Sequence, residues 1–188
     1  VLLVGVGLQA RVDGLARASL ARQGVVPERV LVTPAPLSML LWRVVAMTPD
    51  GYVMADRSLV ADRGPMRFAA HASDTAALQA VAAYPAVQRL GWFNHGFMRA
   101  QVQPGAATAA GVQDGADGHD TLVLSDLRMG LEPDYAFNFA VARRGADGRW
   151  QPQPPQRVPT GPGAALSRDG LGALWRHMRQ RIAHEPLP

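Results

Sequence analysis

A strongly apolar strand followed by a tight turn dominates the first third of the chain. Residues 40–47 read LLWRVVAM, with Arg43 as the single charge, and the turn sequence TPDG follows at residues 48–51. In such a turn proline presets φ, aspartate hydrogen-bonds to the local backbone, and glycine accepts a positive φ. Residues 52–60 read YVMADRSLV and supply a returning strand, so the region predicts an antiparallel hairpin.

The register of this hairpin decides which charges face each other. If the turn is of type I followed by a glycine bulge, Thr48 lies opposite Tyr52, and Arg43 then lies opposite Arg57. Two arginines that face each other on one side of a sheet repel unless an acidic group lies between them. Asp126 is the candidate for that group. A register shifted by one residue would remove the pairing of the two arginines.

The remaining strand and helix patterns predict an α+β fold. Further strands are expected at residues 29–33, 66–71, 97–102, 121–129 and 135–143 and around Trp150, before a proline-rich connector at 151–163; helices are expected at 9–23, 73–84 and 171–182. Strands and helices do not alternate, and short turns join most strands. We therefore predict a mainly antiparallel sheet of six or seven strands, with N-terminal, central and C-terminal helices packed on it.

The length of the chain suits one well-cored domain. We expect residues 25–188 to form it, with a mobile loop at 104–120, where glycine, alanine and aspartate predominate. Residues 1–8 read VLLVGVGL, far short of the roughly 20 residues that span a bilayer. They indicate either a buried helical start, which the residues alone favour, or the tail of a membrane helix. Because the chain begins with valine, we take it to be a fragment or a processed product.

Composition excludes several kinds of site. The absence of cysteine excludes disulfides, thiolate zinc sites, iron–sulfur clusters and cysteine nucleophiles. Basic residues number 19, all of them arginine, against 15 acidic ones, which gives a formal net charge of +4. This balance permits binding to phosphate or anionic lipid without requiring it. No basic helix is interleaved with aromatic residues, so we do not expect a nucleic-acid partner.

Five residues are candidates for a ligand site. Arg43, Arg57, Asp126 and Arg128 could form one partly buried ion network, because Asp126 and Arg128 share a face of their predicted strand. The favoured interpretation is a structural salt bridge between Arg43 and Asp126. The alternative is an arginine cluster that binds a small carboxylate or phosphate ligand. His95 could act as an acid, a base or a ligand, although packing of its ring within the segment LGWFNHGF is favoured.

No metal site is predicted from the histidines. No pair shows the HxH or HxxxH spacing that places two imidazoles around one ion.

Three stretches together resemble a known family. They read PAPLSMLLWRVVAMTPDGYVMADRSLV at residues 34–60, RLGWFNHGFMRAQ at 89–101 and LVLSDLRMGLEPDYAFNFAVARR at 122–144. In this order they resemble the C-terminal soluble portion of the YdjM-like inner-membrane proteins, described as LexA-binding or as membrane-bound metal-dependent hydrolases.

The resemblance implies a membrane context. Family members carry transmembrane helices upstream, with a region bearing His and Asp that is thought to hold the metal, so none of those ligands can be placed on this sequence. Residues 1–24 would then be the end of a membrane-proximal helix and its soluble continuation. Arg11, Arg17 and Arg22 favour the cytoplasmic side of the inner membrane.

Two functions follow as expectations. The first is a soluble accessory domain of a membrane-bound metal-dependent hydrolase, whose divalent metal lies upstream and whose partners are the rest of that protein and the membrane; no cofactor is expected in these residues. The second is a non-catalytic binding or interaction module that uses an arginine-lined face for a small anionic ligand or a protein partner.

Overall fold

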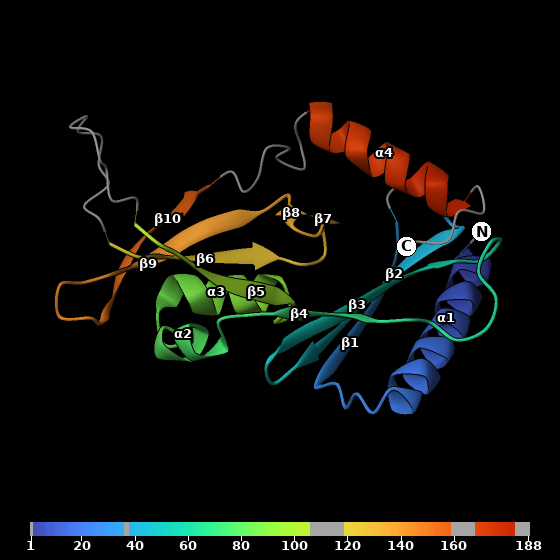
Figure 1. Ribbon diagram of the computed structural model, residues 1–188, viewed down its shortest axis with the longest axis horizontal. Helices are drawn as coiled ribbons and strands as arrows, with labels where there is room; N and C mark the ends of the chain where they lie inside the picture. Colours follow the sequence, from blue (N-terminus) through green and yellow to red (C-terminus); the bar gives the residue numbers. More distant parts are fainter. Residues whose placement is uncertain (1, 36–37, 106–118, 159–167, 183–188) are drawn as a thin grey trace. The chain divides into compact units, whose positions relative to one another are not determined.

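The computed structural model describes residues 2–35, 38–105, 119–158 and 168–182 (Figure 1). The chain divides into two compact units. Unit 1 comprises residues 1–72 and 166–188, and unit 2 comprises residues 73–165. Residues 25–188, predicted to form a single domain, therefore contribute to both units.

Unit 1 is built on a four-stranded antiparallel sheet. Its strands follow the chain in the order β1 (Arg29–Pro34), β2 (Leu41–Thr48), β3 (Gly51–Ser58) and β4 (Ala69–Ala72). Helix α1 (Leu2–Arg22) packs against this sheet through Val12, Ala16 and Leu20, which are spaced four residues apart and all buried. Helix α4 (Arg168–Ile182) belongs to the same unit.

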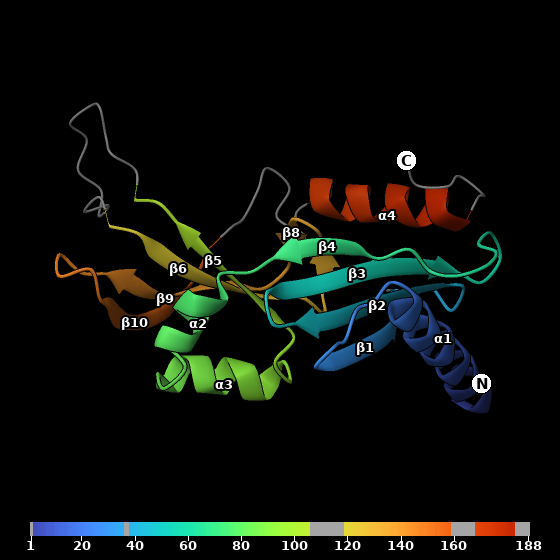
Figure 2. The same ribbon diagram turned by 60° about the horizontal axis from the view of Figure 1, so that its bottom comes forward.

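Unit 2 is built on a second four-stranded antiparallel sheet. The order across this sheet is β10 (Trp150–Arg157), β9 (Asn138–Arg144), β6 (Thr121–Asp126) and β5 (Met98–Gln103). Helices α2 (Thr75–Ala80) and α3 (Pro85–Phe93) cover one face of the sheet (Figure 2). Val81 and Val87 pack there against Leu122 and Leu124 of β6. A two-stranded pair, β7 (Gly130–Leu131) and β8 (Asp134–Tyr135), follows β6.

The prediction of one sheet with six or seven strands is wrong. The α+β class and the antiparallel pairing are present, but the strands divide between two four-stranded sheets and a short pair. Apolar periodicity predicts where strands occur and does not specify which strands pair across a long connection. The connection from β4 to β5 contains α2 and α3, and the strands on its two sides belong to different sheets.

The predicted hairpin between β2 and β3 forms, but the predicted register is wrong. Thr48 pairs with Gly51, so the loop contains two residues, and Arg43 lies opposite Asp56. Arg57 lies opposite Trp42. Because a shift of one residue moves every side chain to a new partner, the expected repulsion between two arginines is replaced by an attraction.

Two further predictions concern the N-terminal segment, residues 1–24, and the loop at residues 104–120. Residues 1–24 contain α1, which runs without a break from Leu2 to Arg22. None of the helices in the described ranges combines the length and the apolar character that crossing a membrane requires. The loop predicted at 104–120 lies outside the described residues for its central part, 106–118.

Candidate functional site

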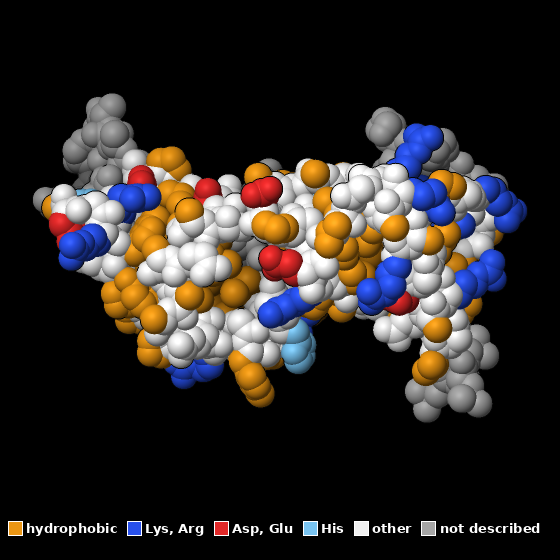
Figure 3. All heavy atoms as spheres, turned by 90° about the horizontal axis from the view of Figure 1, so that it is seen from below, with side chains coloured by type: hydrophobic (Ala, Val, Ile, Leu, Met, Phe, Trp, Pro, Cys, Tyr) orange, Lys and Arg blue, Asp and Glu red, His pale blue; other side chains and the backbone are white. Residues whose placement is uncertain are grey.

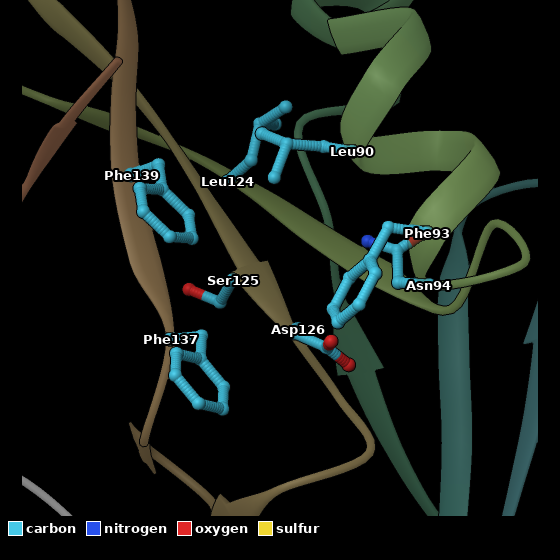
Figure 4. A pocket seen from close by; sticks show the side chains of 8 residues that line it. All are labelled: Leu90, Phe93, Asn94, Leu124, Ser125, Asp126, Phe137 and Phe139. Carbon is cyan, nitrogen blue, oxygen red and sulfur yellow. The ribbon is translucent and has the colours of Figure 1, made fainter. Parts of the chain in front are cut away.

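A cavity of about 240 Å³ lies in unit 2 between α3 and the sheet (Figure 4). Helix α3 and the residue after it supply one wall, β6 supplies the floor, and β9 with the residues before it supplies the opposite wall. The lining residues are Leu90, Phe93, Asn94, Leu124, Ser125, Asp126, Phe137 and Phe139.

The helical wall follows from how α3 begins and ends. Pro85 occupies the first turn, where its missing N–H costs nothing. Leu90, Phe93 and Asn94 are spaced by three and four residues, so they share the face of the helix that lies over the cavity. The helix ends at Phe93, and His95 and Gly96 reverse the chain with φ angles of 55° and 78°. This reversal leads directly into β5.

The sheet wall is formed by aromatic and aliphatic side chains held in register. Leu124 on β6 pairs with Phe139 on β9. Phe137 precedes Phe139 by two residues and so lies on the same side of the chain. The backbone N–H of Asp126 donates to the carbonyl of Phe137 over 2.9 Å, which fixes this end of the wall. The cavity is therefore lined mainly by apolar groups.

One ion pair lies at the edge of the cavity. The carboxylate of Asp126 accepts four hydrogen bonds from Arg128. The backbone N–H of Arg128 donates one, its Nε donates to both carboxylate oxygens, and its Nη2 donates one at 2.7 Å. This hydrogen bonding to Asp126 raises the pKa of Arg128 above its ordinary value. The guanidinium of Arg128 also lies 4.8 Å from the ring centroid of Phe93. The charge of Asp126 is thus compensated by a neighbouring residue of its own chain segment.

Asn94 supplies a polar group that is not compensated in this way. The residue is only 3% exposed, and its Oδ1 accepts a hydrogen bond from the N–H of Gly96 at 3.0 Å. Among the described residues, no hydrogen bond is formed by its Nδ2. Figure 4 shows this nitrogen turned toward the cavity. The site therefore combines apolar walls with one amide donor and with the hydroxyl of Ser125, whose Oγ has no hydrogen-bond partner among the described residues.

The structure separates the predicted ion network into two pairs. Asp126 and Arg128 come together in unit 2, but β6 ends at Asp126 and Arg128 lies in the turn that follows, so the two do not share a strand face. In unit 1, Arg43 bonds Asp56 at 3.0 Å and Arg57 donates to the carbonyl of Gly64 at 2.9 Å. The expected partner of Arg43 was Asp126; its salt bridge is made instead with the residue that the hairpin register places opposite.

His95 lies at the end of α3, outside the lining of the cavity. It is exposed, like Trp92 before it, whereas Phe97 is buried. In the ranges that the structure describes, no group of three or more His, Asp or Glu residues is placed to hold a metal ion.

A polar cluster in unit 1 was not predicted from the sequence. The carboxylate of Asp56 accepts from Arg43 and lies 2.6 Å from Nε2 of His177 on α4. Burial would raise the pKa of Asp56, but the hydrogen bond from His177 and the charge of Arg43 outweigh burial and lower that pKa to about 2. Arg181 donates to Asp62 at 2.7 Å. The available signal was the spacing of His177 and Arg181, which lie four residues apart on one helix face.

Comparisons with protein-family models, with curated proteins and with solved structures found no match.

Proposed function

We propose that this chain is a non-catalytic binding module and that the cavity of unit 2 is its ligand site. One observation carries the proposal. All eight lining residues come from two of the stretches that the sequence analysis singled out, residues 89–101 and 122–144. Segments some thirty residues apart thus converge on one small apolar cavity, and neither segment contributes to the polar cluster of unit 1.

The lining defines the chemistry of the ligand. Small-molecule sites combine apolar walls with a few polar groups that fix orientation. Here the walls are leucine and phenylalanine side chains, and Nδ2 of Asn94 and the hydroxyl of Ser125 can both donate to an acceptor. At roughly 30 Å³ for each water-sized group, the cavity of about 240 Å³ accommodates about eight carbon atoms. The expected ligand is a small apolar molecule with one oxygen acceptor.

The resemblance supports a second candidate function. In it, the chain is an accessory domain of a membrane-bound metal-dependent hydrolase of the inner membrane, with the catalytic metal in another part of the protein. The cavity would then hold a part of the substrate or product. Its support is that two of the three stretches carrying the resemblance line this one cavity. Hydrolysis of ester or phosphate substrates by this chain alone would contradict the view that the chemistry lies elsewhere.

Binding of 1-octanol tests the ligand site directly. Isothermal titration calorimetry is expected to show saturable binding to the wild type. Leu90→Phe fills the cavity from α3 and is expected to weaken binding at least about tenfold, which corresponds to about 1.4 kcal/mol. The matched control is Leu40→Phe, because Leu40 is 44% exposed and belongs to unit 1. Equal binding by the two variants would contradict the proposed site, and amide NMR spectra would show that both variants are folded.

A further inference from the structure

Aromatic rings make up much of the wall of the cavity. Phe93 lines it from α3, and Phe137 and Phe139 line it from the opposite wall (Figure 4). These are three of the five phenylalanines in the chain, so more than half of the phenylalanine rings gather at one small cavity. Aromatic rings attract each other in edge-to-face and offset arrangements, and each pair contributes more than its buried area alone. A flat aromatic ligand can form such pairs with both walls, which a saturated ligand of the same size cannot.

Asn94 decides the polarity of the group that the ligand presents. Its Oδ1 accepts a hydrogen bond from the N–H of Gly96 at 3.0 Å, and this bond fixes which end of the amide faces the backbone. Nδ2 is the end turned toward the cavity, and it carries two hydrogens but accepts no hydrogen bond. The hydroxyl of Ser125 can either donate or accept, so it does not discriminate between ligand groups. The group that matches Asn94 is therefore an oxygen that only accepts, as in a carbonyl.

The lining offers no counter-charge to an ionic ligand. Asp126 is the one charged residue among those that the structure places in the lining, and its carboxylate is paired with Arg128. Moving an ion out of water into such surroundings costs free energy that no contact there returns. At the mouth, Phe93 is 58% exposed, and Figure 3 shows hydrophobic side chains gathered at the surface over α2 and α3. A neutral ligand suits both the lining and its surroundings.

We propose that the ligand of the cavity is a neutral aromatic carbonyl compound, an inference that rests on the proposed function of the cavity. The aromatic ring lies among Phe93, Phe137 and Phe139, and the carbonyl oxygen accepts a hydrogen bond from Nδ2 of Asn94. A benzene ring and a two-carbon acyl group together contain about eight carbons, the number that the cavity of about 240 Å³ accommodates. Acetophenone is the simplest probe with this composition.

Three eight-carbon compounds test the ring and the carbonyl group separately, with each affinity measured by isothermal titration calorimetry. Cyclohexyl methyl ketone keeps the carbonyl group but has a saturated ring. 1-Phenylethanol keeps the aromatic ring but carries a hydroxyl, whose hydrogen needs an acceptor that Nδ2 of Asn94 cannot supply. Acetophenone is expected to bind about twofold to tenfold more tightly than either, the range for one aromatic pair or one hydrogen bond. Binding of acetophenone that is no tighter than that of both counterparts would overturn the proposal.

Asn94→Asp reverses the polarity of this position while keeping its other contact. One carboxylate oxygen can still accept from the N–H of Gly96, and the second oxygen replaces the Nδ2 donor with an acceptor. At pH 8 the variant is expected to bind 1-phenylethanol more tightly than acetophenone. Gln88→Glu is the matched control, since Gln88 is an exposed amide of α3 outside the lining. An unchanged preference for acetophenone in Asn94→Asp would contradict the proposal, because the carbonyl group would then be bound elsewhere.

The infrared stretching band of the bound carbonyl group reports the hydrogen bond in the wild type itself. Hydrogen bonding lowers the frequency of this band, so acetophenone bound to the wild type is expected to absorb below acetophenone dissolved in hexane. The frequency in Ser125→Ala should match that in the wild type. A bound band at the hexane frequency, or a lowering that Ser125→Ala removes, would overturn the assignment of the donor to Asn94.

Binding of 1-octanol separates this inference from the proposed function. If 1-octanol binds but acetophenone has no advantage over its two counterparts, an aromatic carbonyl ligand is ruled out and the cavity remains a ligand site. If 1-octanol and all three compounds fail to bind, both proposals fail.

Discussion

The carboxylate of Asp56 is held by Arg43 and His177, and its protonation should govern stability in acid. Its pKa of about 2 in the folded state lies below the ordinary value of 3.8. The unfolded state therefore binds the proton more readily, and stability is lost as the pH falls from about 4 toward 2. A shift of this size corresponds to about 2 kcal/mol.

Urea denaturation of Asp56→Asn and of the wild type tests this directly. The gap between their unfolding free energies is expected to be constant above about pH 4 and to shrink by about 2 kcal/mol near pH 2. Asp50→Asn, in the turn between β2 and β3, is the control for loss of an exposed carboxylate. A gap between wild type and Asp56→Asn that does not change with pH would show that Asp56 is not held in its charged form.

Removal of the hydroxyl from two buried serines is expected to have opposite effects on the unfolding free energy. Oγ of Ser19 accepts from the N–H of Met66 and donates to the carbonyl of Leu15, whereas Oγ of Ser125 has no hydrogen-bond partner among the described residues. Both residues are fully buried. Removing a bonded hydroxyl leaves its partners unsatisfied, while removing an unbonded one relieves a desolvation cost. We expect Ser19→Ala to lower the unfolding free energy by about 1–2 kcal/mol and Ser125→Ala to leave it unchanged or raise it. Thermal denaturation of the two variants measures the contrast, and a comparable loss in both would contradict it.

Single residues also show where inference from the sequence stopped. The turn sequence TPDG correctly predicted a hairpin, but it fits loops of two or three residues, and only the observed register reveals Asp56 as the partner of Arg43. Asp126 was expected to bond Arg43, but its partner is Arg128, which lies in the turn after β6 and not on the strand face assumed from the sequence. The bond between Asp56 and His177 joins residues 121 positions apart, and no local pattern encodes such a contact.

At the scale of elements, α4 is attached to its own unit by polar contacts. Arg181 is almost fully buried and donates through Nη2 to Asp62 and to the carbonyl of Asp56. His177 adds the contact with the Asp56 carboxylate. Loss of a buried charged partner costs more than loss of an exposed one.

Hydrogen exchange of α4 amides tests this attachment. Arg181→Gln is expected to lower the protection of residues 176–182, because Asp62 loses its partner and the helix detaches more often. Arg179→Gln is the matched control, since Arg179 is an exposed arginine of the same helix. Equal protection in the two variants would mean that apolar contacts alone hold α4.

Elements with a regular pattern of apolar residues could be predicted from the sequence. Strand β10, which is rich in proline, could not. The apolar stripe of α1 and the apolar run of β6 predicted a helix and a strand that the structure contains. Residues 150–157 form β10 although they include three prolines and read as an extended connector. Proline is tolerated there because β10 is an edge strand, pairs with β9 alone among the described strands, and shifts register between Pro152 and Gln156.

At the scale of the whole molecule, each unit has its own sheet and its own core. An apolar cluster of unit 2 contains Val81, Leu122 and Val141, and its members all lie within residues 73–165. The division into two sheets could not be read from the sequence, because apolar periodicity predicts strands and does not specify which of them pair. The cavity could not be read either, although the segments that line it could be singled out.

Excision of unit 2 tests its independence. A fragment of residues 73–165 is expected to fold, because its helices and strands bury their apolar residues against one another. Its amide NMR spectrum should overlay the corresponding signals of the full chain. A spectrum with the narrow dispersion of an unfolded chain would show that unit 1 is needed for folding.

Methyl NMR of the full chain tests the central claim that the cavity beside α3 is a ligand site. With leucine methyl groups labelled, titration with 1-octanol is expected to shift the signals of Leu90 and Leu124, which line the cavity, and to leave Leu41 of unit 1 unchanged. In Leu90→Phe the shift of Leu124 should disappear. Saturable shifts confined to Leu41, or no saturable shift at Leu90 and Leu124, would contradict the claim.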